Sequence, residues 1–173
     1  MGDLKSIVDD AWKHRDCPEL LVKKFQEIFE DYHDDPVYLF EYANALDFLW
    51  KEVEAIPLYQ RSIALGISGI MRVKAEIQLG SSLSIIGDNE GAISILSKVQ
   101  EETRDPAALI FLCIALLRSG EIRKSLKTAL IFILKGNHGL SPEYERTLLN
   151  YIDEIDWFLL MLNSNQESTG VSF

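Results

Sequence analysis

The spacing of apolar residues predicts helices along most of the chain. The clearest stretch is residues 79–99, in which apolar side chains recur every three or four positions on both sides of the pair Gly87-Asp88. Glycine favours the left-handed conformation that ends many helices, and aspartate is a common residue at the start of the next one. The stretch therefore predicts two antiparallel helices joined by a tight turn. Its apolar positions are Leu79, Leu83, Ile86, Ala92, Ile93, Leu96 and Val99.

Small residues occur where the two helices of this hairpin would come closest. Gly80 and Ala92 take these positions, and a larger side chain at either would hold the helices apart. The same pattern recurs 37 residues upstream, counted from Ala55 to Ala92, and 33 residues downstream, counted from Ala92 to Ser125. The three hairpins thus place Ala43, Gly80 and Cys113 opposite Ala55, Ala92 and Ser125, respectively.

A helix hairpin that repeats about every 34 residues is typical of solenoid proteins. Here the pattern resembles the tetratricopeptide repeat family, from Pro36 to Lys135 and most strongly in LGSSLSIIGDNEGAISIL. The resemblance implies an all-α, right-handed solenoid of antiparallel hairpins. Trp50 stands where the family has a turn glycine, and Ser125 and Ala129 replace its usual alanine and aromatic residue. A helical bundle without repeats is the alternative, because such bundles also carry small residues at helix crossings.

The boundaries predict one helical-repeat domain over residues 1–162, followed by a flexible tail over 163–173. Pro36, Pro106 and Pro142 each follow an aspartate or a serine, a combination typical of a helix start. The domain would comprise a capping hairpin (1–35), repeats at 36–66, 69–101 and 106–135, and a C-terminal helix (142–162). The stretch from Trp157 to Leu162 is apolar on every side of that helix, so neighbours would cover it or it would form a homodimer seam.

The resemblance also implies where a partner would bind, because in this family the first helix of each repeat lines a concave face that receives a peptide or a helix. That face is mostly apolar here, which favours an apolar peptide or an amphipathic helix. The chain's own tail or a second subunit could fill it instead, or the residues could form ordinary core with no groove. The candidate binding residues are Phe40, Asn44, Phe48, Lys74, Ile77, Gln78, Ser81, Ile110, Phe111, Ile114 and Arg118. Val37, Asp47, Ser84, Ile85, Ala107 and Leu117 are further candidates for the same face.

The charge of the chain argues against two classes of partner. It has 27 acidic and 17 basic residues, a net charge of −10, and 14 of the acidic residues lie in the first 66 positions. Nucleic acid and anionic membrane surfaces would be repelled. The acidity is explained by solubility, or it attracts a basic partner.

The cysteines and the N-terminal stretch predict where in the cell the protein is located. Cys17 and Cys113 are too few for a disulfide framework or a zinc site, and both are expected to be free thiols. The N-terminal stretch MGDLKSIVDDAWK has no apolar core of signal-peptide length. We therefore expect a cytoplasmic protein.

No group of residues suggests catalysis or metal binding. His14, His33 and His138 are expected at helix ends or in loops, and the acids near the first two lack a second pair of ligands. The sequence has no glycine-rich phosphate loop and no nucleophilic serine motif, and its adjacent acidic residues point to different sides of a helix or loop. It therefore predicts no catalytic residue, no metal ligand and no cofactor.

These inferences favour a non-catalytic protein-protein interaction module, either an adaptor or a regulatory subunit. Some members of the family hold a C-terminal carboxylate with lysines, asparagines and an arginine, but only Asn44 and Lys74 match that set here. The alternatives are a receptor for a short signalling peptide, a homodimer formed through the C-terminal helix, and a small-molecule enzyme on a helical scaffold.

Overall fold

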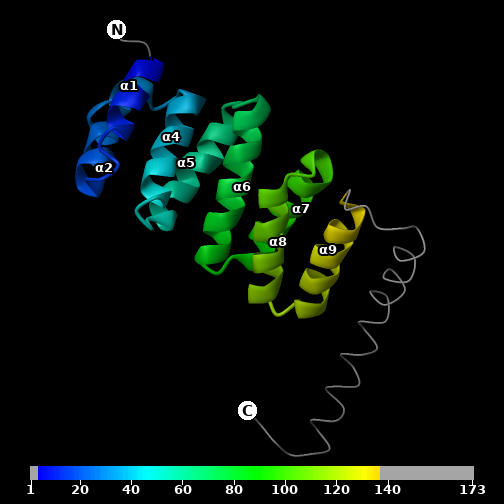
Figure 1. Ribbon diagram of the computed structural model, residues 1–173. Helices are drawn as coiled ribbons and strands as arrows, with labels where there is room; N and C mark the ends of the chain where they lie inside the picture. Colours follow the sequence, from blue (N-terminus) through cyan, green and yellow to red (C-terminus); the bar gives the residue numbers. More distant parts are fainter. Residues whose placement is uncertain (1–3, 137–173) are drawn as a thin grey trace, which may run out of the picture.

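The computed structural model describes residues 4–136, and within them the chain forms nine α-helices and no strand (Figure 1). The helices are α1 (Leu4–Trp12), α2 (Pro18–Glu27), α3 (Phe29–Tyr32), α4 (Pro36–Asp47), α5 (Glu52–Ala64), α6 (Gly69–Ile85), α7 (Asn89–Thr103), α8 (Pro106–Arg118) and α9 (Ile122–Lys135). Apart from the four-residue α3, they follow one another as pairs along a single direction.

Three hairpins form the body of this array, namely α4–α5, α6–α7 and α8–α9. The two helices of each hairpin pack together, and successive hairpins meet where α5 packs on α6 and α7 packs on α8. The first helices of the hairpins also touch, because α6 contacts both α4 and α8. The expected all-α solenoid is therefore confirmed, and α4, α6 and α8 lie side by side.

Aspartates and prolines define the starts of the first helices as expected. The Asp35 carboxylate accepts hydrogen bonds from the backbone N–H groups of Val37 and Tyr38, and the Asp105 carboxylate accepts one from Ala107. Pro36 and Pro106 take the first helical positions, where no backbone hydrogen bond is lost. Ser68 precedes α6 without making a side-chain cap, which is a departure from the expectation.

The small residues lie at the helix crossings. A Cβ atom on Gly80 would come within 2.5 Å of Leu96 Cγ, so α6 and α7 are as close here as a glycine allows. In the third hairpin the Ser125 hydroxyl donates to the Cys113 carbonyl oxygen over 2.9 Å. Ala43 and Ala55 are fully buried in the first hairpin. Because few other side chains would fit, these positions fix how closely each pair packs.

The turn of the first hairpin differs from the other two. Gly87 and Gly120 follow α6 and α8 with φ angles of 93° and 85°, and Trp50 takes the corresponding place after α4 with a φ of 59°. Residues other than glycine adopt this left-handed conformation at a cost of about 1–2 kcal/mol. The Trp50 side chain is 81% exposed, so packing does not explain its presence.

The N-terminal region differs in one respect from the two helices expected over residues 1–35. The second helix is interrupted at Ile28, whose φ of −113° and ψ of 6° are not helical, and the chain continues as the short α3. Both α1 and α2 pack on α4, which extends the main core to Val8 and Phe25.

Several expectations concern residues outside the described range. These are the C-terminal helix (142–162), its apolar stretch from Trp157 to Leu162, the tail (163–173) and His138. Among the helices that the structure does describe, none is both long enough and apolar enough to span a bilayer.

Candidate functional site: the groove between α4, α6 and α8

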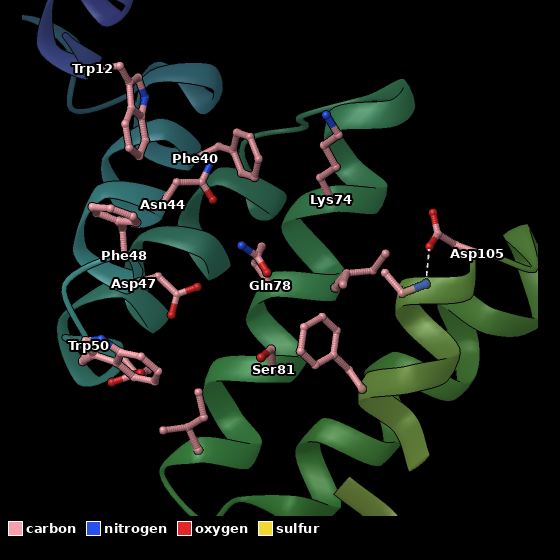
Figure 2. Close-up of a pocket in the computed structure, with 15 residues that line it drawn as sticks. Trp12, Phe40, Asn44, Asp47, Phe48, Trp50, Lys74, Gln78, Ser81 and Asp105 are labelled. Atoms are coloured by element: carbon pink, nitrogen blue, oxygen red, sulfur yellow. Dashed lines mark hydrogen bonds between the residues drawn. The ribbon is translucent and has the colours of Figure 1, made fainter. Parts of the chain in front are cut away.

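An open groove of about 1030 Å³ runs across the first helices of the three hairpins (Figure 2). Its lining comes from the end of α1, from α4 and the turn after it, from the start of α5, and from α6 and α8. The lining residues are Trp12, Phe40, Asn44, Asp47, Phe48, Trp50, Glu52, Lys74, Ile77, Gln78, Ser81, Ile85, Asp105, Ala107 and Phe111. We call this feature the groove.

The middle of the groove is apolar and rigid. Phe40 and Ile77 are only 4% and 6% exposed, so these two side chains belong to the core as much as to the groove wall. Phe40 packs against the Tyr59 ring, and Ile77 packs in a cluster with Val99 and Ala108. A ligand would therefore meet a preformed apolar surface, which lowers the entropy cost of binding.

Three aromatic side chains form one edge of the groove. Figure 2 shows Trp12, Phe48 and Trp50 following one another along this side, which we call the aromatic edge. Trp12 is held in place because its indole N–H donates to Glu41 over 3.0 Å and its ring meets the Phe48 ring edge-on, with centroids 6.3 Å apart. Phe48 and Trp50 are largely exposed, so their rings are available to a ligand.

A carboxylate lies beside the aromatic edge. Asp47 is the last residue of α4, and Figure 2 shows its side chain pointing into the groove. The Ser82 hydroxyl donates to it over 3.2 Å and the Tyr59 hydroxyl over 3.4 Å. Burial nevertheless raises the pKa of Asp47, and the negative charge of Glu52 raises it further. The ionised form of the Asp47 side chain is therefore less stable here than in water.

Glu52 is the second acidic residue at this end of the groove. It is the first residue of α5 and only 7% exposed, although it lines the groove. Among residues 4–136, no group donates a hydrogen bond to its carboxylate and no cation pairs with it or with Asp47. The two carboxylates therefore form a negative site that the described chain does not neutralise.

The remaining polar residues line the other parts of the groove. Lys74, Gln78 and Ser81 follow one another along α6, and the Lys74 side chain extends towards the start of that helix, away from Asp47 (Figure 2). The Asn44 carbonyl oxygen accepts a 2.8 Å hydrogen bond from the Tyr59 hydroxyl. The Asp105 carboxylate is already engaged, because it caps α8.

The structure brings eight of the eleven predicted binding residues into the groove, with Ile110, Ile114 and Arg118 outside it. The eight are Phe40, Asn44, Phe48, Lys74, Ile77, Gln78, Ser81 and Phe111. Arg118 donates instead to the Ser84 hydroxyl over 3.0 Å.

Ile110 differs from its counterparts in the first two repeats. It has the same repeat position as Phe40 and Ile77, which are both buried. Ile110 is 58% exposed and does not line the groove. The repeat register therefore relates Ile110 to two residues of the groove without placing Ile110 in the groove.

Four lining residues were not predicted from the sequence, namely Trp12, Trp50, Glu52 and Asp105. Trp12 was assigned to the capping hairpin, and nothing in the periodicity shows that α1 reaches the groove. Trp50 was noted only as a departure from the turn glycine. That departure, a large aromatic residue where the repeat needs a left-handed backbone, was the signal that could have identified it.

The groove can bind side chains non-covalently, through apolar contacts at its centre and polar contacts at its ends. None of its lining residues is a histidine or a cysteine. His33 lies at the end of α3, where its ring is 3.3 Å from the Asp34 carboxylate. Within the described residues there is no cluster of three or more potential metal ligands.

Comparisons with known proteins agree with this architecture. A family model described as "Tetratrico peptide repeat" matches residues 36–155. A solved structure described as "MamA RS-1 ArsTM double mutant" shares the fold, with a TM-score of 0.64 and 17% identity, over 92% of this chain and 98% of that chain. Among curated proteins, no sequence matches this chain.

Proposed function

This chain belongs to the tetratricopeptide repeat family, and from that premise we propose that it is a non-catalytic adaptor or regulatory subunit that binds a polypeptide segment in the groove. Repeat arrays of this family are generally protein-interaction modules, because stacked hairpins create an extended surface. The proposal assigns that role to one surface of this chain, the side formed by α4, α6 and α8.

The observation that carries the proposal is the composition of the groove. Exposed aromatic and aliphatic side chains, among them Phe48, Trp50 and Ile85, lie together with unengaged polar groups around a preformed apolar centre. Surfaces that combine aromatic anchors with a few polar groups are typical of peptide-binding sites. An exposed apolar patch of this kind would otherwise reduce solubility.

The dimensions favour a short segment. Neighbouring helices pack about 8–10 Å apart, so a groove across three of them is about 20 Å long. An extended chain rises about 3.3 Å per residue, so about six residues would span it. We propose that the segment comes from a neutral or basic partner protein, since the acidic chain would repel nucleic acid or an anionic membrane. The two free cysteines suit a reducing compartment, and we propose the cytoplasm as the location.

The proposal can be tested by selecting peptides of about eight residues from a random display library on the immobilised full chain. The double variant Phe48→Ser/Ile85→Ser removes two exposed apolar side chains from the groove. We expect the selected peptides to bind this variant about tenfold or more weakly than the parent.

A matched control removes the same kind of surface elsewhere. Val53 and Ile70 are exposed aliphatic residues outside the groove, so Val53→Ser/Ile70→Ser should bind the selected peptides like the parent. Equal binding by all three proteins, at equal melting temperature, would show that the peptides use another surface. Failure to select any binding peptide would count against the proposal as a whole.

A further inference from the structure

The groove carries two acidic side chains, Asp47 and Glu52, with which no cation among residues 4–136 pairs. Asp47 is at the C-terminal end of α4, where the helix dipole disfavours negative charge. The corresponding residues in the second and third repeats are the uncharged Ser84 and Leu117. The hairpin therefore does not require a carboxylate at this position.

Glu52 is the second carboxylate of the groove without a paired cation among residues 4–136. Most of the Glu52 residue is buried while its carboxylate reaches solvent in the groove, where a cation or hydrogen-bond donors would stabilise its charge. Here the residue is only 7% exposed, lines the groove, and has no donor or cation for its carboxylate among residues 4–136. The start of α5 supplies only the partial positive charge of the helix dipole, which does not pair with the carboxylate as a cation would.

The aromatic residues beside Asp47 and Glu52 favour one kind of cation over others. The aromatic edge of Trp12, Phe48 and Trp50 lies next to Asp47 (Figure 2). A guanidinium group is planar and weakly hydrated, it stacks on aromatic rings, and it can donate to two carboxylates at once. Within the described residues no third potential metal ligand joins the two carboxylates, and a hydrated metal ion would not use the flat aromatic rings beside them.

We propose that the groove selects a peptide segment with an arginine, whose guanidinium group lies between Asp47 and Glu52 beside the aromatic edge. Apolar side chains on either side of that arginine would lie along Phe40, Ile77 and Phe111. This inference rests on the proposed function and adds to it the chemical class of the segment.

Charge disfavours two other occupants of the groove, the chain's own C-terminal part and a second copy of the chain. The segment 137–173 carries six acidic residues and a single arginine, so the chain's own C-terminal part would meet like charge in the groove. A second copy of the chain, with a net charge of −10, would do so as well. A separate partner with a basic segment fits the site better than either.

The test uses four peptide mixtures of about eight residues, with leucine, isoleucine, phenylalanine, alanine and serine at the variable positions. The central residue is fixed as arginine, citrulline, leucine or glutamate. Citrulline has nearly the shape of arginine without its charge. Binding of each mixture to the full chain is measured at about 0.15 M salt, where surface charges more than about 8 Å apart are screened.

We expect the arginine mixture to bind about ten- to a hundredfold more tightly than the citrulline mixture, as for a charge-assisted hydrogen bond. The glutamate mixture should bind most weakly. In the variant Asp47→Asn/Glu52→Gln the preference for arginine over citrulline should disappear, while the leucine mixture binds as before. Both replacements keep the size of the side chain, and circular dichroism shows whether the variant is folded.

The control variant is Glu54→Gln/Glu101→Gln, which removes the same charge from exposed positions outside the groove and should keep the preference. Equal binding of the arginine and citrulline mixtures to the parent would overturn the inference, even if the Asp47→Asn/Glu52→Gln variant did not fold. The proposed function would stand in that case, provided that Phe48→Ser/Ile85→Ser still weakened binding. Binding of no mixture at all would overturn both.

Discussion

Trp50 offers a test of the left-handed turn after α4 and of the aromatic edge of the groove. The residue has a φ of 59° and an 81% exposed side chain. We compare Trp50→Gly with Trp50→Ala, because both variants remove the indole ring and differ only in how well the new residue tolerates a left-handed backbone.

The expected difference follows from two opposing contributions. An alanine in this conformation costs the folded state about 1–2 kcal/mol, which a glycine avoids. The glycine in turn makes the unfolded chain more flexible, which costs about 0.4–1 kcal/mol on folding. The Trp50→Gly variant should therefore be more stable than the Trp50→Ala variant by about 0.5–1 kcal/mol, or about 1–4 °C in melting temperature. In an ordinary helical position the order would be reversed.

Thermal unfolding followed by circular dichroism measures the difference, and Gly87→Ala is the mirror control. Gly87 has a φ of 93°, and a Cβ atom there would meet nothing within 4 Å, so only the backbone conformation would matter. That replacement should lower the melting temperature by a similar amount. Both Trp50 variants should bind groove-selected peptides more weakly than the parent. If Trp50→Ala were as stable as Trp50→Gly, this would contradict a left-handed backbone conformation at residue 50.

Three further predictions concern the crossing, the acidic site and the end of the array. Gly80→Ala should lower the melting temperature, because overpacking against Leu96 costs about 1–3 kcal/mol and the gain in helix propensity is about 1 kcal/mol; a higher melting temperature would place Gly80 away from the crossing. Asp47 has a raised pKa in the folded state, so its ionisation destabilises the fold above that pKa, and the effect is absent below its ordinary value of 3.8. Asp47→Asn should therefore raise the melting temperature near neutral pH and leave it unchanged in acid, and an equal change at both pH values would contradict this. Ile110 is 58% exposed, so Ile110→Ser should change the free energy of unfolding in urea by less than about 0.5 kcal/mol, and a loss of about 1–3 kcal/mol would contradict its exposure.

The repeat fold could be predicted because its determinants are local in sequence. Gly80 and Ala92 mark a crossing between neighbouring helices, and the aspartate-proline pairs at Pro36 and Pro106 mark helix starts. The position of each helix in the array then follows from the period alone. The break at Ile28 was not predictable, since the apolar stripe continues through it into α3.

The candidate groove could be predicted only in part, because it depends on contacts between repeats and on the capping hairpin. The resemblance to the family predicted Lys74, Gln78 and Ser81 on the concave face, and all three line the groove. Trp12 reaches the groove from α1 through its hydrogen bond to Glu41, a contact between residues that no repeat pattern relates.

The most direct test of the groove as a peptide-binding site is to locate a bound peptide on the protein. A photoreactive phenylalanine analogue is placed at Ser81, which lines the groove, or at Ser94, which is exposed on α7. Each protein is irradiated with peptides selected on the parent, and the adducts are identified by mass spectrometry. We expect a peptide adduct at position 81 and none at position 94. An adduct at position 94 with none at position 81 would contradict binding in the groove.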